Sequence, residues 1–335
     1  MAIKEAIVHF IERQDGEQTN ISQRRSLLTL NSPLEGLISK VVAAYNNRSG
    51  KIYGGFETDP QQFPFSGWLQ QYLNGEIDLV QFSDHSLKHF KSLLDQQAES
   101  VTGYLLFSRQ RVLEQEQLII LLLSTSPAVI IDDELELNDA RHLDLGKVQM
   151  GVKINLDEWR QEGSSQYISF VKSRSGKELN ESFRQFIGCT EELDAKEQTQ
   201  TLLKVFKDYC DQSYPDQGKV SEVKQKAYEY CNEQVESGER VQIKELSVAL
   251  DTTDPDKFFN YVSEHDSPLQ SNIPADRSGL KKFVRYSGSM KGISISFSEM
   301  LLGEQVVYDP DTDTLMIRGT PPTLKKQLNR GKDKA

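Results

Sequence analysis

LIILLL, residues 118–123, is the longest aliphatic run in the chain and decides the expected fold. Because its apolar residues are continuous rather than alternating, the run predicts a central strand that is covered on both faces. Further apolar strands are expected at residues 103–107 and 128–131. The run is far shorter than the roughly 20 apolar residues of a membrane-spanning helix, so no membrane association is expected.

Outward from this run, the sequence predicts an N-terminal α+β domain over residues 1–175, with a mixed sheet and covering helices. Residues 5–13 alternate as a strand does, and residues 20–28 are expected to pair with them as a hairpin. Asn31 or Ser32 can cap a helix that runs to Tyr45. The other expected elements are helices within residues 62–98, strands near residues 148–155 and 167–171, and a short helix around Trp159.

The middle of the chain, residues 176–270, is acidic and has helical periodicity. Four or five helices are expected, separated by Gly188, Pro215, Gly218, Gly238 and the TTDP turn. Residues 243–250 and 256–265 could form a helix-turn-helix. However, Lys257 is the only lysine or arginine of the second helix, so packing is favoured over DNA recognition.

The net charge of −11 over 335 residues argues against a protein coated in nucleic acid and allows binding only through a local basic face. Cys189, Cys210 and Cys231 form no CxxC pair, which is typical of reduced thiols in the cytoplasm. The N-terminal residues also lack the apolar stretch of a signal peptide. The chain is therefore expected to stay in the cytoplasm.

A C-terminal basic α+β module with antiparallel strands is expected over residues 271–335. Residues 276–335 contain 11 Lys and Arg against 7 Asp and Glu, so this part carries +4 and residues 1–275 carry −15. A helix over residues 278–286, three strands and a basic helix opening at Pro322 are predicted. The residues expected to contact nucleic-acid phosphates are Arg277, Lys281, Lys282, Arg285, Lys291, Arg318, Lys325, Lys326 and Arg330.

Two basic clusters form the core of this expectation. On a helix, the i and i+4 positions of Lys281 and Arg285 would share one face. Lys325, Lys326 and Arg330 form the second cluster. A solvated helix face is the better explanation of one cluster alone, and the two clusters together fit a surface for phosphates as well as they fit solvated faces.

Motifs that would indicate catalysis or metal binding are incomplete. His85 and His89 have metal-ligand spacing but lack a third ligand, so a solvated helix face is favoured. The aspartates at 309, 311 and 313 are better explained by a hairpin turn than by a calcium loop or a nuclease site, because the glycine and glutamate of a calcium loop are missing. GSMKG, residues 288–292, lacks the order of a P-loop and predicts a turn that presents Lys291. We expect no catalytic residue, metal or cofactor.

Several stretches resemble the bacterial nucleoid-associated protein family called NdpA or YejK. They are HLDLGKVQMGVKINLDEW at residues 142–159, YEYCNEQ at residues 228–234, and the C-terminal LLGE, YDPDTDTL and IRGTPP. The resemblance covers essentially the whole chain and is densest at the C-terminus. It implies a cytoplasmic protein that associates with the nucleoid and binds nucleic acid without known catalysis.

The sequence hypothesis is therefore a non-enzymatic nucleoid protein that binds double-stranded DNA, or RNA, through phosphate contacts and without sequence preference. The alternative is an adaptor that reaches the nucleoid by binding a DNA-processing protein through its acidic surface. A homodimer would double the basic surface and would help an acidic chain to bind DNA.

Overall fold

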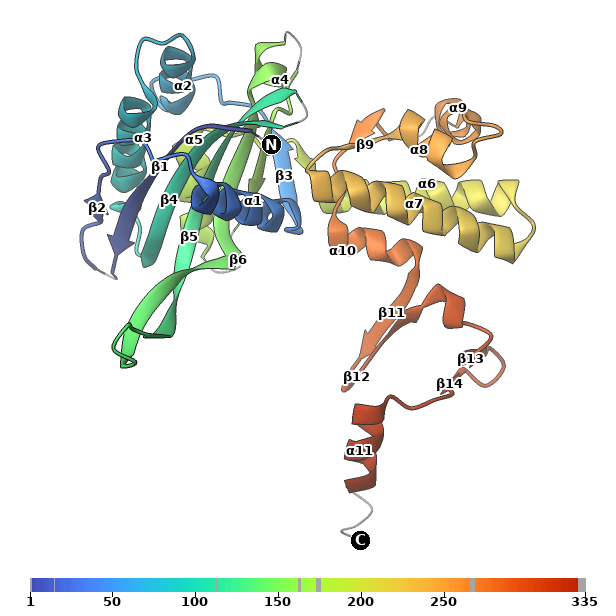
Figure 1. Cartoon of the computed structure of the whole chain (residues 1–335). Helices are drawn as coiled ribbons and strands as arrows, with labels where there is room; N and C mark the ends of the chain where they lie inside the picture. The colour runs from blue at the N-terminus through green and yellow to red at the C-terminus, as the bar shows by residue number, and fades with distance from the viewer. Residues whose placement is uncertain are drawn as a thin grey trace.

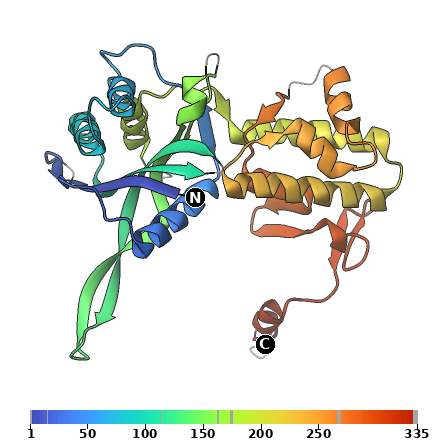
Figure 2. The same cartoon turned by 45° about the horizontal axis from the view of Figure 1, so that its top comes forward.

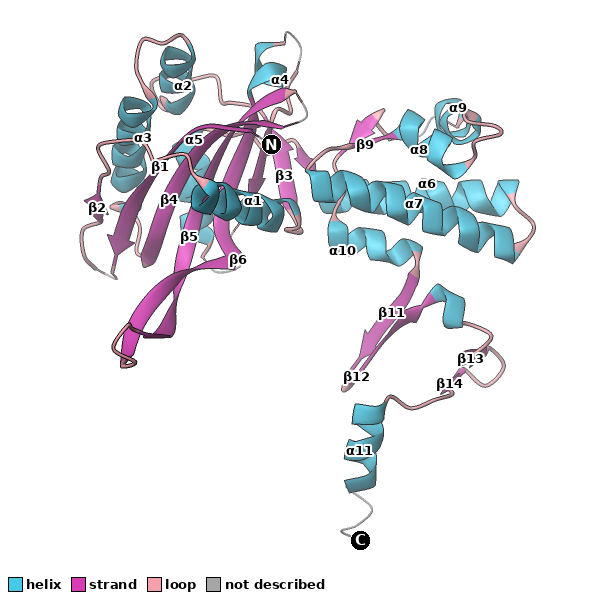
Figure 3. Cartoon of the chain, in the orientation of Figure 1, coloured by secondary structure: helices cyan, strands magenta, loops and turns pink. Residues whose placement is uncertain are grey.

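The computed structural model describes residues 2–14, 16–112, 114–161, 164–172, 176–265 and 269–330. An antiparallel sheet with helices forms an N-terminal unit, a group of helices forms a second unit, and small strand pairs follow near the C-terminus (Figures 1 and 3). The predicted α+β class is confirmed. None of the helices in these ranges is both long and apolar enough to cross a membrane.

The N-terminal sheet has the strand order β2-β1-β4-β5-β6-β7-β3-β8. Every described pair of neighbours is antiparallel, so the expectation of a mixed sheet is wrong. The reason is that β4, β5 and β6 are joined by short hairpin turns, which can connect only antiparallel strands. The strands are β1 (Ala2–Arg13), β2 (Asn20–Ser22), β3 (Lys51–Gly54), β4 (Val101–Val112), β5 (Gln115–Ile131), β6 (Leu137–Asn155), β7 (Ile168–Val171) and β8 (Leu193–Asp194).

The predicted central strand is the first half of β5, and its six aliphatic residues are at most 1% exposed. Leu118, Ile120 and Leu122 enter the core on one face of the sheet, and the alternate residues enter the core on the other face. The prediction of a strand covered on both faces is confirmed.

A separate strand at residues 128–131 is not found, because β5 continues through Pro127 to Ile131. In this part β5 pairs with β6 alone, so the missing N–H of Pro127 can face the free edge without breaking the ladder. Register shifts lie at Leu122/Leu123 and Leu123/Thr125, where the hairpin leaves the sheet. Residues 125–143 form a two-stranded projection, here called the arm, which extends beyond the helices (Figure 1).

Helices cover the two faces of the sheet unequally. One face packs against α2 (Phe65–Leu73), α3 (Leu79–Leu94) and α5 (Lys177–Ile187), and the other packs against α1 (Ser32–Asn46). Asn31 caps α1 by accepting from the amide of Leu34 at 3.0 Å, as the sequence predicts. Short α4 (Leu156–Arg160) contains Trp159.

The first core extends past residue 175, where the sequence places the end of the N-terminal domain. Phe186 of α5 stacks on Phe90 of α3 with ring centroids 4.8 Å apart, and β8 pairs with β3. We therefore propose that the N-terminal unit ends at Asp194.

The second unit contains α6 (Ala195–Ser213), α7 (Gln217–Ser237), α8 (Ile243–Leu250) and α9 (Lys257–Glu264). Short β9 (Val241–Gln242) pairs with β10 (Asn272–Ile273) beside them. Leu246 of α8 and Phe258 of α9 are buried in the second core. These two helices therefore pack against the rest of the unit, which is the role that the sequence favours over DNA recognition. Leu280 and Phe283 also enter this core, so we propose that the helical unit ends near residue 284 rather than at residue 270.

Two lysines, Lys51 buried and Lys153 half-buried, lie where the units meet, and each binds the C-terminal end of a helix. Lys153 of β6 donates to the carbonyl of Gly238 at the end of α7 at 2.6 Å, and Lys51 donates to the carbonyl of Asn46 at the end of α1. A lysine is favourable there because the last carbonyls of a helix are unsatisfied and carry partial negative charge. Burial lowers the pKa of Lys51 to about 7, and the charge of Lys153 adds to this shift.

The lowered pKa of Lys51 predicts a stability that increases as the pH rises above 7. Between about 7 and the ordinary value of 10.5, the unfolded chain binds more protons than the folded chain, so deprotonation favours folding. We expect the free energy of unfolding to increase by about 1 kcal/mol from about pH 7.5 to about pH 8.5 because of this group. Urea unfolding of the wild type and of Lys51→Met at both pH values measures this gain. The same pH dependence in both proteins would contradict the assignment.

Candidate nucleic-acid interface

The basic C-terminal part begins at Asp276, which caps α10 (Arg277–Leu280) and joins both units. Its carboxylate accepts from the amides of Gly279 at 2.9 Å and Gly50 at 2.8 Å, and its own amide donates to Thr199 Oγ1 at 2.7 Å. Burial raises the pKa of Asp276, but hydrogen bonds from a neighbouring hydroxyl and these two amides outweigh it, so the pKa lies below its usual value. The start of the basic segment is therefore firmly held.

Two lysines are displayed where the segment leaves the second core. In the 3-10 helix η1 (Lys281–Phe283), the ring of Phe283 packs nearly perpendicular to that of Phe206, with centroids 5.0 Å apart. Leu280 and Phe283 are three residues apart and therefore share the inward side of such a helix. Lys281 and Lys282 lie between them and are exposed.

The predicted helix over residues 278–286 ends at Phe283, and the chain continues as a hairpin of β11 (Arg285–Met290) and β12 (Ile293–Ser298). The prediction that Lys281 and Arg285 share a helix face is therefore wrong. Glycine and serine in β11 are poor helix formers, and pairing with β12 decides the structure. The guanidinium of Arg285 instead crosses the hairpin and donates to Ser296 Oγ at 3.2 Å.

The hairpin turn presents Lys291, as the sequence predicts. Gly292 has φ +82°, in the left-handed region that favours glycine, and Lys291 beside it is exposed. Behind the hairpin, Glu299 of the 3-10 helix η2 (Glu299–Leu301) pairs with Lys224 of α7 at 2.6 Å. This ion pair ties the base of the hairpin to the helical unit.

The aspartates at 309, 311 and 313 lie in the turn between β13 (Val306–Asp309) and β14 (Thr314–Ile317), which confirms the hairpin prediction. Asp309 organises this turn by accepting from the amide of Asp311 at 3.0 Å and the hydroxyl of Thr312 at 2.7 Å. Its side chain therefore serves the turn. Arg318 follows β14 and is exposed.

Helix α11 (Pro322–Arg330) opens at the predicted proline and carries the second basic cluster. Lys325 and Lys326 are exposed, and so are Leu324 (45%) and Leu328 (59%). Within the C-terminal module, Figures 1 and 2 both show α11 as the element furthest from the helical unit, whereas α10 lies against that unit. The two basic clusters therefore lie at opposite ends of the module, and the exposed cations are distributed along it.

Two of the predicted binding residues stand apart from this group. Arg277 is half-buried, donates to Asn47 Oδ1 and pairs with Glu236 at 3.0 Å, so its guanidinium joins α10 to the rest of the protein. Arg330 ends α11, and its side chain lies outside the described part of the chain.

The exposed cations of the module lie away from carboxylates. In the body, many lysines and arginines lie beside carboxylates, as in the pairs Lys91–Asp95 at 2.5 Å and Lys172–Glu191 at 2.7 Å. Among the described residues, no carboxylate lies within ion-pairing distance of Lys281, Lys282, Lys291, Arg318, Lys325 or Lys326. These six charges are free to meet an external anion.

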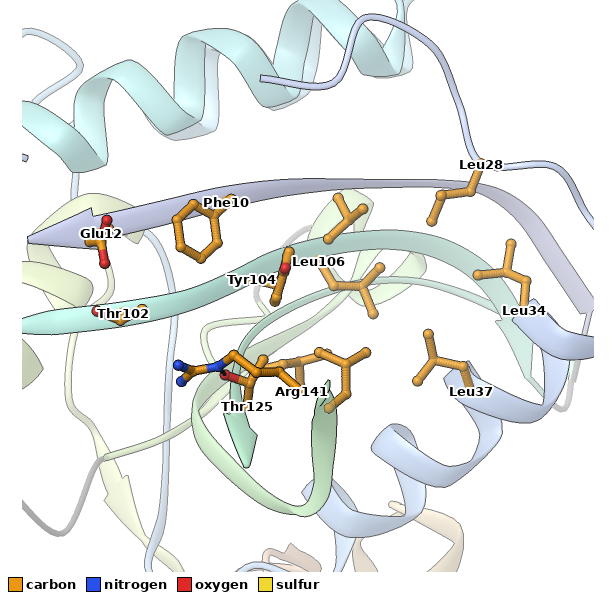
Figure 4. A pocket seen from close by; sticks show the side chains of 13 residues that line it. Phe10, Glu12, Leu28, Leu34, Leu37, Thr102, Tyr104, Leu106, Thr125 and Arg141 are labelled. Carbon is orange, nitrogen blue, oxygen red and sulfur yellow. Dashed lines mark hydrogen bonds between the residues drawn. The ribbon is translucent and has the colours of Figure 1, made fainter. Parts of the chain in front are cut away.

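An apolar groove on the N-terminal unit was missed by sequence reasoning. It has a volume of about 460 Å³ and lies between α1 and the sheet, with Phe10, Tyr104 and Leu37 among its lining residues (Figure 4). Its residues come from β1, β4, β5, β6 and α1, so no local pattern marks it. None of the predicted binding residues lines it.

The histidine pair of α3 is close to an aromatic ring. The rings of His85 and His89 lie 5.6 and 5.8 Å from that of Trp68. Within the described ranges, no group of three His, Cys, Asp or Glu side chains could hold a metal ion.

The chain is similar to known proteins along nearly all of its length. The family described as "NA37: Nucleoid-associated protein YejK" matches residues 7–325. A nucleoid-associated protein of Pseudomonas putida strain F1 is 38% identical over 335 residues, which cover 99% of this chain and 100% of that protein. Those of Pseudomonas savastanoi pv. phaseolicola (38%, 98% of this chain, 100% of that protein) and Pseudomonas fluorescens strain Pf-5 (36%, 98% and 99%) are similar over 332 residues.

Proposed function

Since the chain belongs to the family of nucleoid-associated proteins described as YejK, we propose that it binds nucleic acid at the nucleoid through its C-terminal module. Duplex DNA is the proposed ligand, and RNA is the alternative. The contacts are made to backbone phosphates, without sequence preference and without catalysis. The cytoplasmic nucleoid is the location that the family implies.

The observation that carries this proposal is the row of six exposed cations without carboxylate partners, on a chain whose net charge is −11. Phosphate oxygens are strong acceptors, and neutralising them releases counterions from the nucleic acid. Lys281 and Lys282 lie at one end of the row, Lys291 lies on a hairpin turn, and Lys325 and Lys326 lie at the other end. Such a row suits the extended backbone of a duplex.

The two short helices α8 and α9 have the order of a helix-turn-helix, but α9 does not present side chains for reading bases. This supports binding without sequence preference. Phe258 and Val262 of α9 are buried in the second core. The ammonium of Lys257 lies 4.7 Å from the centre of the Tyr214 ring, so the one cation of this helix is directed to a neighbouring side chain. Base recognition in the major groove requires arginine, lysine, asparagine or glutamine reaching the base edges.

Salt-dependent binding tests the proposal. With four to six phosphate contacts, the slope of log K against log salt is expected to be about −4 to −5 for a duplex of about 20 base pairs. Fluorescence anisotropy with the purified full chain, at several salt concentrations and with two unrelated sequences, measures this slope. An RNA of the same length shows which nucleic acid is preferred. Absence of binding at low salt, or tight binding to only one sequence, would overturn the proposal.

The adaptor alternative is favoured by the charge of −15 on residues 1–275, which would repel DNA and attract a basic protein. Nuclease treatment separates the two functions. An adaptor keeps its DNA-processing partner after the nucleic acid is digested, whereas a direct DNA binder loses it.

A further inference from the structure

The arm exposes more apolar surface than its role in the sheet requires. Val129, Ile130, Ile131, Leu135 and Leu137 are between 51% and 83% exposed. They lie on one hairpin that projects from the N-terminal unit (Figure 1), where Ile131 is directly opposite Leu137. Because side chains alternate along a strand, Val129, Ile131 and Leu137 share one face of the hairpin. A contiguous apolar patch of this kind marks a surface that binds another molecule.

The charge of the arm points to a basic occupant. Its outer part, residues 128–139, contains five Asp and Glu and no Lys or Arg. Asp132 organises the turn by accepting from the amides of Glu134 at 2.9 Å and Glu136 at 3.0 Å. The carboxylates of Glu134 and Glu136 are exposed and directed to solvent. The arm therefore offers aliphatic side chains bordered by negative charge.

Helix α11 has the complementary surface. Leu324 and Leu328 are four residues apart and share one helix face, and both are exposed. Lys325 and Lys326 flank them, and the helix contains no acidic residue. The leucines of α11, which are bordered by positive charge, thus complement the aliphatic residues of the arm, which are bordered by negative charge.

We propose that the arm of one copy docks on α11 of a second copy of this chain. Within one chain the two surfaces project from different units (Figures 1 and 2). Because the two surfaces are different, the contact is head-to-tail, and each copy keeps one free arm or one free helix for a further copy. The assembly therefore grows with protein concentration instead of stopping at a dimer, unless it closes into a ring.

The available area is sufficient for a weak and reversible association. Aromatic side chains bury about 150–250 Å² each, and aliphatic ones somewhat less, so Val129, Ile131 and Leu137 on one face contribute roughly 300 Å². Weak and transient interfaces bury less than about 1,200 Å² in total, with both partners counted. The charges bordering the patch then set the orientation and make the association sensitive to salt.

Paired charge reversals test the contact in the absence of nucleic acid. One variant carries Glu134→Lys and Glu136→Lys in the arm, and the other carries Lys325→Glu and Lys326→Glu in α11. The helix variant opposes an acidic helix to the acidic arm, and the arm variant lowers the charge of residues 128–139 from −5 to −1. Each variant alone therefore loses the charge match, so sedimentation at low salt is expected to give the monomer mass of 38.1 kDa. An equal mixture brings together the unmodified arm of one variant and the unmodified helix of the other, so it is expected to regain masses above the monomer. The wild type is expected to show such masses at the same concentration.

Asp254→Lys with Glu264→Lys makes the same charge change as the arm variant at exposed positions outside both surfaces, and it should associate as the wild type does. A wild type that stays monomeric at high concentration and low salt would overturn the proposal. So would an arm or helix variant that associates normally alone, or a mixture that remains monomeric. Because no nucleic acid is present, the result is independent of the proposed DNA binding.

Discussion

Changing Lys281, Lys282, Lys325 and Lys326 to glutamate is expected to weaken duplex binding by about 10³-fold at 0.1 M salt. These lysines are exposed at the two ends of the C-terminal module, and no carboxylate of the described chain pairs with them. Losing four phosphate contacts should also make the slope of log K against log salt less negative by about 4. Anisotropy titrations at several salt concentrations give both quantities.

The matched control reverses four exposed lysines of the body, Lys40, Lys204, Lys207 and Lys244. It changes the net charge by the same amount and should retain most of the binding, because the interaction is local at this salt concentration. If both variants lose affinity equally, net charge rather than the module controls binding. If neither loses affinity, the site assignment is wrong.

The central strand could be predicted because a strand that is buried on both faces has a continuous apolar run in its sequence. The continuation of β5 into the arm could not be predicted in the same way. Polar residues 124–126 and Pro127 indicate the end of a strand, and only the pairing with residues 137–143 of β6 carries β5 through them. Strand length at this position is thus decided by a long-range contact, which local propensity does not contain.

At the candidate site, the charges could be predicted but not their surroundings. Arg277 looks like its basic neighbours in the sequence, yet it binds Asn47, 230 positions away, and Glu236. Arg285 continues a helical pattern that the hairpin interrupts. The apolar residues 128–131 predict a strand but not its exposure, because burial depends on which elements pack against a residue and not on the residue alone.

Changing Phe283 to alanine is expected to destabilise the second core by about 3–5 kcal/mol. Phe283 is 2% exposed and packs on Phe206, so its removal leaves a cavity at the point where the C-terminal module is attached. Phe297 of β12 is an appropriate control, because its ring contacts Tyr286 on a partly exposed hairpin. Phe297→Ala should cost much less.

The three cysteines allow this effect to be located within the chain. Cys210 and Cys231 are buried in the second core, whereas Cys189 is buried in the first. When labelling requires transient opening of a core, its rate follows the free energy of that opening. Phe283→Ala should therefore accelerate labelling of Cys210 and Cys231 by about 10²–10⁴-fold and leave Cys189 unchanged. Equal acceleration at all three thiols would mean that the two units unfold together and that the proposed boundary at Asp194 does not separate independent cores.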